Sequence, residues 1–223
     1  QGGAAERAFQ LAYELTPDTD VLLAYGRFKR YRGEFDEAVR LGQRAVELDP
    51  QSGFTLGQLG VTYRFARRFD EAVAALQRSM ELPPGPALGV ILNIAQAEAG
   101  RGNFSEAGRQ LDLGQEFPQN ASVFRLSQLA LASSLAGRTD DAARYFSDFQ
   151  KRAEVSTASD TQWARAYIAV GDYDAALLSI ESAVNDRSSA DLASLAELAA
   201  NSWGDPMLDE PEFRELLDAL WVD

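Results

Sequence analysis

The chain has 223 residues, of which 46% are hydrophobic, and it carries a formal net charge of −13. Cysteine and histidine are both absent, which excludes disulfides, thiolate nucleophiles and zinc thiolate sites and removes the commonest general base. The negative charge disfavours nucleic acid and anionic lipid as partners, and no run of eighteen apolar residues is present to span a bilayer. We therefore predict no enzyme activity, no metal site, no cofactor, and neither nucleic-acid binding nor membrane insertion.

One alanine returns at an almost constant interval from residue 5 to residue 176. Its successive positions are separated by 33, 34, 35, 35 and 34 residues and are Ala5, Ala38, Ala72, Ala107, Ala142 and Ala176. A period of this length indicates a helical solenoid, in which each unit contributes two helices and stacks on its neighbours.

A short turn between two expected helices precedes most of these alanines. The turn glycines are Gly33, Gly102, Gly137 and Gly171, and the second turn has Arg67 in this place. Glycine there predicts a left-handed residue that ends the first helix of the unit. An aromatic residue follows in most turns and is expected to fill the gap between the two helices; these residues are Phe35, Phe69, Phe104 and Tyr173. The polar residue after it is expected to cap the second helix.

Small residues recur within both helices of a unit. The first helices carry Gly26, Gly60, Ala95, Ala130 and Ala164, and the second helices carry Ala45, Ser79, Gly114 and Ala183. Small side chains let paired helices approach closely. Phe149 interrupts the second series, and we expect its ring to displace the next helix and to make residues 153–159 a soft joint.

These residues resemble the tetratricopeptide-repeat family, most clearly in the Leu59, Gly60 and Tyr63 pattern and in the closing prolines Pro50, Pro84 and Pro118. The resemblance implies an all-α, right-handed solenoid of antiparallel helix pairs. Its expected boundaries are a second helix of a truncated repeat at 1–18, five repeats within 19–190 (19–52, 53–87, 88–122, 123–156 and 157–190), and a helical cap at 191–223. We expect the chain to open in mid-repeat because it is a fragment of a longer protein; loss of a front helix is the alternative.

The C-terminal segment carries a second resemblance. Residues 205–208 (Asp-Pro-Met-Leu), 211–213 (Pro-Glu-Phe) and 216–217 (Leu-Leu) are similar to an ending found in bacterial signalling proteins. In those proteins such repeats follow an adenylyl cyclase domain, a winged-helix regulator or a Ser/Thr kinase. Phe213 and Trp221 are expected to cover the apolar face of the last repeat.

The first helix of each unit is expected to line the concave face of such a solenoid. Four of these helices carry an amide in the same slot, at Gln58, Asn93, Gln128 and Gln162. Other polar residues of this face are Arg27, Arg30, Arg64, Gln96 and Arg165. Amides suit the backbone of an extended peptide, and arginines suit carboxylates. We therefore predict that these nine residues bind a peptide, of acidic character, and that the arginines lie outside the core.

The sequence thus predicts a non-catalytic protein-interaction scaffold, the regulatory part of a larger bacterial signalling protein that binds a peptide segment or its own head domain. The alternative is the accessory repeat region of a multidomain enzyme, a cyclase or transferase, that helps to hold substrate; a free-standing assembly scaffold is a third hypothesis. Self-association through the exposed helix at 1–18 is a further expected contact. We expect a cytoplasmic location, with the periplasm as the alternative.

Overall fold

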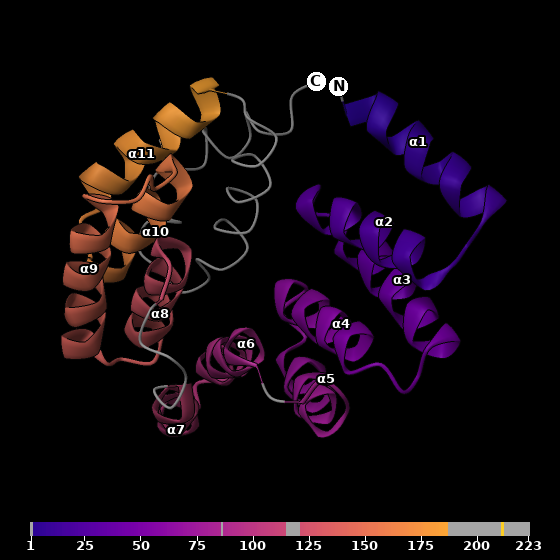
Figure 1. Ribbon diagram of the computed structural model, residues 1–223, viewed down its shortest axis with the longest axis horizontal. Helices are drawn as coiled ribbons and strands as arrows, with labels where there is room; N and C mark the ends of the chain where they lie inside the picture. Colours follow the sequence, from indigo (N-terminus) through magenta and orange to yellow (C-terminus); the bar gives the residue numbers. More distant parts are fainter. Residues whose placement is uncertain (1, 86, 115–120, 187–210, 212–223) are drawn as a thin grey trace. The chain divides into compact units, whose positions relative to one another are not determined.

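The computed structural model describes residues 2–85, 87–114, 121–186 and 211 of the chain. Eleven α-helices and no β-strand occupy these described residues (Figure 1). They are α1 (Gly2–Leu15), α2 (Thr19–Tyr31), α3 (Phe35–Leu48), α4 (Gly53–Phe65), α5 (Phe69–Glu81), α6 (Leu88–Gly100), α7 (Phe104–Gly114), α8 (Val123–Leu135), α9 (Thr139–Ala153), α10 (Asp160–Val170) and α11 (Tyr173–Asp186). Apart from residue 211, the expected cap at 191–223, with its signalling-protein pattern, lies outside the described residues.

The helices pack as consecutive pairs, α2 on α3, α4 on α5, α8 on α9 and α10 on α11. The chain divides into two compact units within α6, with the described residues up to Ala97 in the first unit and those from Glu98 onward in the second. The two-helix period that the alanines predict is therefore present in both.

The turns inside the pairs have the left-handed residue that the glycines predict. The backbone φ angles are +72° at Gly33, +77° at Gly102, +73° at Gly137 and +76° at Gly171. Arg67 takes the same place in the α4–α5 turn with φ +58°, a conformation that costs a residue with a side chain about 1–2 kcal/mol. The α4–α5 turn thus keeps the shape of the others without their glycine.

Side-chain caps lie at the starts of the first helices of the pairs. Asp18 Oδ1 accepts from the Val21 amide at 2.9 Å, and Ser52 Oγ accepts from the Thr55 amide at 3.1 Å. By contrast, α3, α5 and α9 begin without a side-chain cap, so the capping expected from the polar residues of these turns is wrong. Those acids lie in the first helical turn instead, where they face the positive end of the helix dipole.

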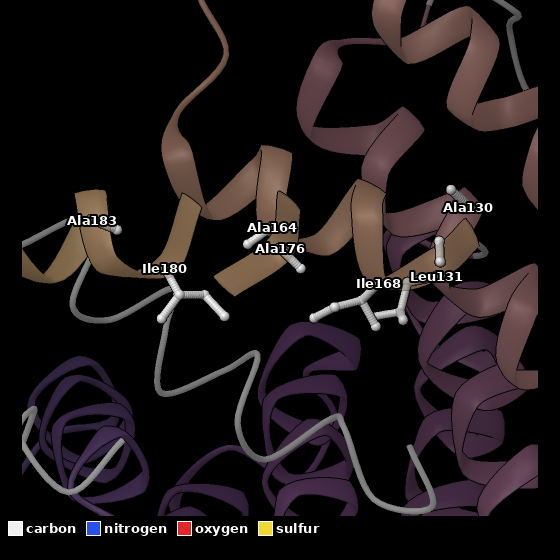
Figure 2. Packing of buried hydrophobic residues seen from close by; sticks show 8 residues of the cluster. Ala130, Leu131, Ala164, Ile168, Ala176, Ile180 and Ala183 are labelled. Atoms are coloured by element: carbon white, nitrogen blue, oxygen red, sulfur yellow. The ribbon is translucent and has the colours of Figure 1, made fainter. Parts of the chain in front are cut away.

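The predicted small residues lie in the core. Ala95, Ala130 and Ala164 are fully buried, and a methyl group added to Gly60 would lie 2.6 Å from Leu76 Cγ. In the second unit, Ala164 and Ala176 meet beside Ile168, Leu131 and Ile180 (Figure 2). Small side chains on paired helices therefore make room for branched ones, as the pattern indicates.

Two packing expectations concern aromatic rings, and the one for Phe104 is wrong. Phe104 is 55% exposed, so it does not fill the gap inside its turn, whereas Phe35, Phe69 and Tyr173 are half-buried. Phe149 is fully buried and meets the Trp163 ring edge-on, with 4.8 Å between ring centres. The Phe149 ring is thus part of the core, while the displacement of the next helix and the soft joint at 153–159 stay predictions.

Candidate functional site

The predicted site residues fall into both compact units. Arg27, Arg30, Gln58, Arg64, Asn93 and Gln96 lie in the first unit, and Gln128, Gln162 and Arg165 lie in the second. Arg30, Arg64 and Arg165 are 7%, 2% and 2% exposed, so the expectation that the arginines lie outside the core is wrong for these three. Arg27 is exposed.

Aromatic stacking explains why the arginines of the first unit are buried. The guanidinium carbons of Arg30 and Arg64 lie 4.6 Å and 4.7 Å from the centre of the Phe65 ring, which is itself 2% exposed. Arg30 Nη1 donates to Thr62 Oγ1 at 3.3 Å, and Arg64 Nε donates to Asn93 Oδ1 at 2.8 Å. The delocalised guanidinium is weakly hydrated and stacks on rings, so it tolerates this environment. These arginines link α2 to α4 and α4 to α6.

An equivalent link occurs in the second unit. Arg165 Nη1, on α10, donates to Ser127 Oγ on α8 at 3.4 Å. The guanidinium carbon of Arg165 lies 5.5 Å from the centre of the Phe124 ring. The arginines of the first helices therefore hold successive repeats together in both units, whatever else they contact.

Three of the four aligned amides also have partners inside the fold. Asn93 donates from Nδ2 to the Gly89 carbonyl at 2.7 Å while its oxygen accepts from Arg64. Gln128 Oε1 accepts from Arg125 Nη1 at 2.9 Å, and burial lowers the pKa of the Arg125 guanidinium. Gln162 Oε1 accepts from the Ser159 amide at 3.2 Å and so completes a capping box at the start of α10.

Gln58 differs from these three amides. It is half-buried on α4, and the structure gives its side chain no hydrogen bond within the described part of the chain. One amide donor pair and one acceptor are therefore left for a ligand or for water. Gln96 is 5% exposed, which leaves its side chain little room for an external partner.

An exposed aromatic residue that the sequence reasoning missed lies on the same face of α4. Phe54, one turn before Gln58, is 60% exposed, and the half-buried Val61 lies one turn after it. The second unit repeats the arrangement with Phe124, 36% exposed, four residues before Gln128. The shared signal in the sequence is Phe-x-x-x-Gln at the start of a first helix, 70 residues apart.

We define the α4 stripe as Phe54, Gln58 and Val61. The α2 helix packs beside α4 and contributes the exposed Arg27. The stripe combines an apolar anchor with an amide whose donors and acceptor have no partner in the fold, and Arg27 adds a positive charge nearby on α2. Such a set can hold a peptide backbone and an acidic side chain, and it contains no nucleophile or general base.

No helix in the described residues is both long and apolar enough to cross a lipid bilayer.

Comparison with known proteins supports the helix-pair interpretation. Residues 55–88 match the family profile described as tetratricopeptide repeat. The crystal structure of PilW, a widely conserved type IV pilus biogenesis factor, is similar at 22% identity with a TM-score of 0.58, over 87% of this chain and 90% of that one. A tetratricopeptide repeat protein from Parabacteroides merdae is similar at 16% identity with a TM-score of 0.54, over 99% and 93%.

A third similar structure is the Cut9–Hcn1 hetero-tetramer of the APC/C, at 15% identity with a TM-score of 0.63. The match covers all of this chain and 46% of that one, so this chain spans about half of its length. Together these similarities confirm the predicted fold class, an all-α solenoid of helix pairs of the tetratricopeptide-repeat type.

Proposed function

We propose that this protein is a non-catalytic interaction module that binds an extended peptide segment of a protein partner along the α4 stripe. The observation that carries the proposal is Gln58, a half-buried amide whose side chain forms no hydrogen bond in the described part of the chain, next to the exposed ring of Phe54. The side-chain nitrogen and oxygen of Gln58 reach solvent, so they can exchange water for the polar groups of a peptide backbone.

The chemistry of the stripe favours an apolar and acidic peptide. An exposed phenylalanine provides a rigid anchor for an apolar side chain, because it loses little conformational freedom on binding. The Gln58 amide donates to and accepts from one peptide backbone unit, as a neighbouring strand would. Arg27 supplies a positive charge for a carboxylate of the peptide.

The three buried arginines have a structural role in the proposed binding face, whereas the exposed Arg27 can contact the peptide. Arg30, Arg64 and Arg165 hold neighbouring helices together, so they shape the binding face even where they do not touch the peptide. Reversing their charge would place a carboxylate against an aromatic ring in the core and would perturb folding. Arg27 is therefore the arginine through which direct recognition is best tested.

The wider context proposed here is the regulatory part of a larger bacterial signalling protein. It rests on the pattern at 205–217, which apart from residue 211 lies outside the described residues, and on the match of residues 55–88 to a repeat family. The accessory region of a multidomain cyclase or transferase is the alternative. A winged-helix domain in the same open reading frame supports the regulatory role, and a transferase domain supports the alternative, whereas a cyclase domain fits both.

Selection from a displayed random-peptide library, followed by calorimetry with the selected peptide, tests the binding proposal. We expect Phe54→Ala, Gln58→Ala and Arg27→Glu each to weaken binding by about ten-fold or more. Phe104→Ala is the matched control, because Phe104 is a similarly exposed ring on α7. Peptides that bind all three variants as tightly as the wild type would place the site elsewhere.

A further inference from the structure

Arg125, in the second unit, carries its positive charge at a place where the fold disfavours one. It lies in the first turn of α8, and its backbone amide donates to Oγ of the capping residue Ser122 at 3.3 Å. The backbone amides of a first helical turn carry partial positive charge and oppose a cation there. The Arg125 side chain is also half-buried, and this burial lowers the pKa of its guanidinium. The helix dipole and burial thus both act against the charge.

The described neighbours of Arg125 do not supply a negative charge. Nη1 donates to Gln128 Oε1 at 2.9 Å, and the guanidinium carbon lies 5.7 Å from the centre of the Phe124 ring. Both of these groups are neutral, and within the described residues the structure gives Arg125 no ion pair. By contrast, Arg144 on α9 also lies beside the ring of an adjacent residue but pairs with Asp141 at 2.8 Å. Arg125 therefore has the ring contact without the counter-ion.

A second guanidinium lies at the same ring. Arg165 reaches it from α10, which packs beside α8 within this unit, and its guanidinium carbon is 5.5 Å from the centre of the Phe124 ring. Arg165 is 2% exposed, whereas Phe124 is 36% exposed, so the ring presents part of its surface to solvent with a buried cation beside it. We define the α8 patch as Phe124, Arg125 and Gln128. The α8 patch is thus an apolar surface that lies next to two positive charges.

A single carboxylate is the ligand that fits the α8 patch. Among the described residues Arg125 donates only through Nη1, to Gln128, and the remaining donors of its fork match the two oxygens of a carboxylate. Such an ion pair neutralises a half-buried charge at the positive end of a helix. A polyanion such as nucleic acid meets the long-range repulsion of a chain of net charge −13, which one carboxylate feels far less. The Phe124 ring suits an apolar side chain next to the acidic one.

We propose that the α8 patch binds the side-chain carboxylate of an acidic residue in an extended segment of a partner protein. Arg125 takes the carboxylate, Gln128 holds the guanidinium in place, and an apolar residue of the segment packs on Phe124. This site goes beyond the α4 stripe, because it lies in the other unit and shares no residue with the stripe. Either site can therefore bind while the other fails.

Nuclear magnetic resonance of the 223-residue chain with isotopically labelled arginine tests the site. The probe is a pentapeptide of alternating leucine and glutamate, acetylated and amidated so that its ends carry no charge. We expect it to shift the Nε–Hε signal of Arg125 until that signal saturates; Arg125→Gln, which lacks the signal, assigns it. The same pentapeptide with glutamine in place of glutamate should bind about ten-fold more weakly, since an amide offers one oxygen and no charge.

Arg27→Glu separates this site from the α4 stripe. The variant keeps every residue of the α8 patch, so we expect the dissociation constant read from the Arg125 signal to stay within about two-fold of the wild type. Loss of the Arg125 shift in this variant overturns the proposal of a separate site. A probe that shifts the Arg27 signal but leaves the Arg125 signal unmoved also overturns it, and leaves the α4 stripe standing.

Arg125→Gln measures what the guanidinium contributes. In the Arg27→Glu background we expect it to weaken binding of a fluorescently labelled probe by about ten-fold, followed by anisotropy. The melting temperature should not fall, because the substitution removes a cation from the first turn of α8. Arg144→Gln is the matched control, since Arg144 lies beside a ring but already pairs with Asp141, and it should leave binding unchanged.

Sodium acetate distinguishes a peptide site from a site for any small anion. At the same concentration of carboxylate it should shift the Arg125 signal far less than the glutamate pentapeptide, because it makes no contact with Phe124. An equal shift by acetate, or by the glutamine pentapeptide, overturns the proposal. So does a clear fall in the melting temperature of Arg125→Gln, which would give the guanidinium a role in the fold instead.

Discussion

The α4–α5 pair and the α8–α9 pair occupy the same positions in the repeat but pack with residues of very different size. In the first pair, Gly53 at the start of α4 meets the end of α5, where Ser79 is 3% exposed. In the second pair, Val123 takes the place of Gly53, and Phe149, fully buried, takes the place of Ser79. Both positions hold small residues in the α4–α5 pair and large residues in the α8–α9 pair.

This comparison shows that the two positions change together. A methyl group on Gly53 would lie 2.7 Å from the Ser79 carbonyl oxygen, so the α4 and α5 backbones approach too closely for a side chain between them. In the α8–α9 pair the same space is filled by Val123, Leu126 and Phe149, with Ala166 from the next repeat. The fold thus accepts either small or large residues at these two positions, provided that both positions hold residues of the same kind.

Removing the Phe149 ring should produce the largest effect. We expect Phe149→Ala to lower the free energy of unfolding by about 3–5 kcal/mol, because it leaves a cavity lined by Val123, Leu126 and Trp163. Denaturant-induced unfolding measures the change. Phe104→Ala, at a ring that is 55% exposed, should cost no more than about 1 kcal/mol. Equal losses in the two variants would contradict the packing described for Phe149.

Adding a methyl group to the tight pair should give the next largest effect. Gly53→Ala brings the methyl within 2.7 Å of the Ser79 oxygen and 2.8 Å of the Pro83 oxygen, both on the backbone, so we expect a loss of about 1–3 kcal/mol. Gly57→Ala is the control, since its methyl would meet Ser79 Oγ at 3.6 Å, an ordinary contact. Because alanine favours a helix, that variant should gain up to about 1 kcal/mol. Similar melting temperatures for both variants would refute the close approach.

A substitution in the turn of the α4–α5 pair should change the stability by less, and should raise it. Arg67→Gly should stabilise the protein by about 1 kcal/mol, because it relieves the left-handed φ of +58°. The reverse change, Gly33→Arg, should destabilise the α2–α3 turn by a similar amount, since φ there is +72° and nothing obstructs a side chain. Thermal unfolding measures both. A loss of stability in Arg67→Gly would mean that the arginine side chain stabilises this turn.

Acidification should have the smallest effect. The hydrogen bond from Arg68 lowers the pKa of Glu71 at the start of α5, and that from Gln110, followed by that from Arg109, lowers the pKa of Glu106 on α7. Because these pKa values are lower in the folded state, the ion pairs contribute stability above the ordinary glutamate pKa. That contribution is lost as the pH falls through the folded values. Carboxyl titration by NMR checks the direction, and Glu71→Gln should remove its share of the acid sensitivity.

The sequence by itself determined the repeat, its turns and its small core positions. The alanine period, the turn glycines and the small residues such as Gly60 each have a local cause, since a tight turn needs a left-handed residue and a close contact needs a small one. These requirements hold within one or two helices. They could therefore be read without knowledge of the rest of the fold.

The candidate site was only partly predictable. Gln58 and Arg27 are the predicted residues that keep polar groups open to a partner, while Asn93, Gln128 and Gln162 have partners within the fold. A slot in a repeat alignment shows which face of a helix a residue occupies, but not whether a neighbouring repeat supplies its hydrogen bond. Phe54 was missed because a phenylalanine near a helix start is equally compatible with burial and exposure.

Tertiary structure alone decided the roles of the arginines and of Phe149. A charged residue in a sequence favours the surface, but Arg64 is 2% exposed because Phe65 and Asn93 meet its guanidinium from neighbouring positions. A large ring in a slot for small residues predicts distortion, but Phe149 is fully buried because Val123 and Trp163 surround it. In both cases the free energy of a side chain also depends on partners from another helix, Asn93 for Arg64 and Val123 and Trp163 for Phe149, which a local pattern does not contain.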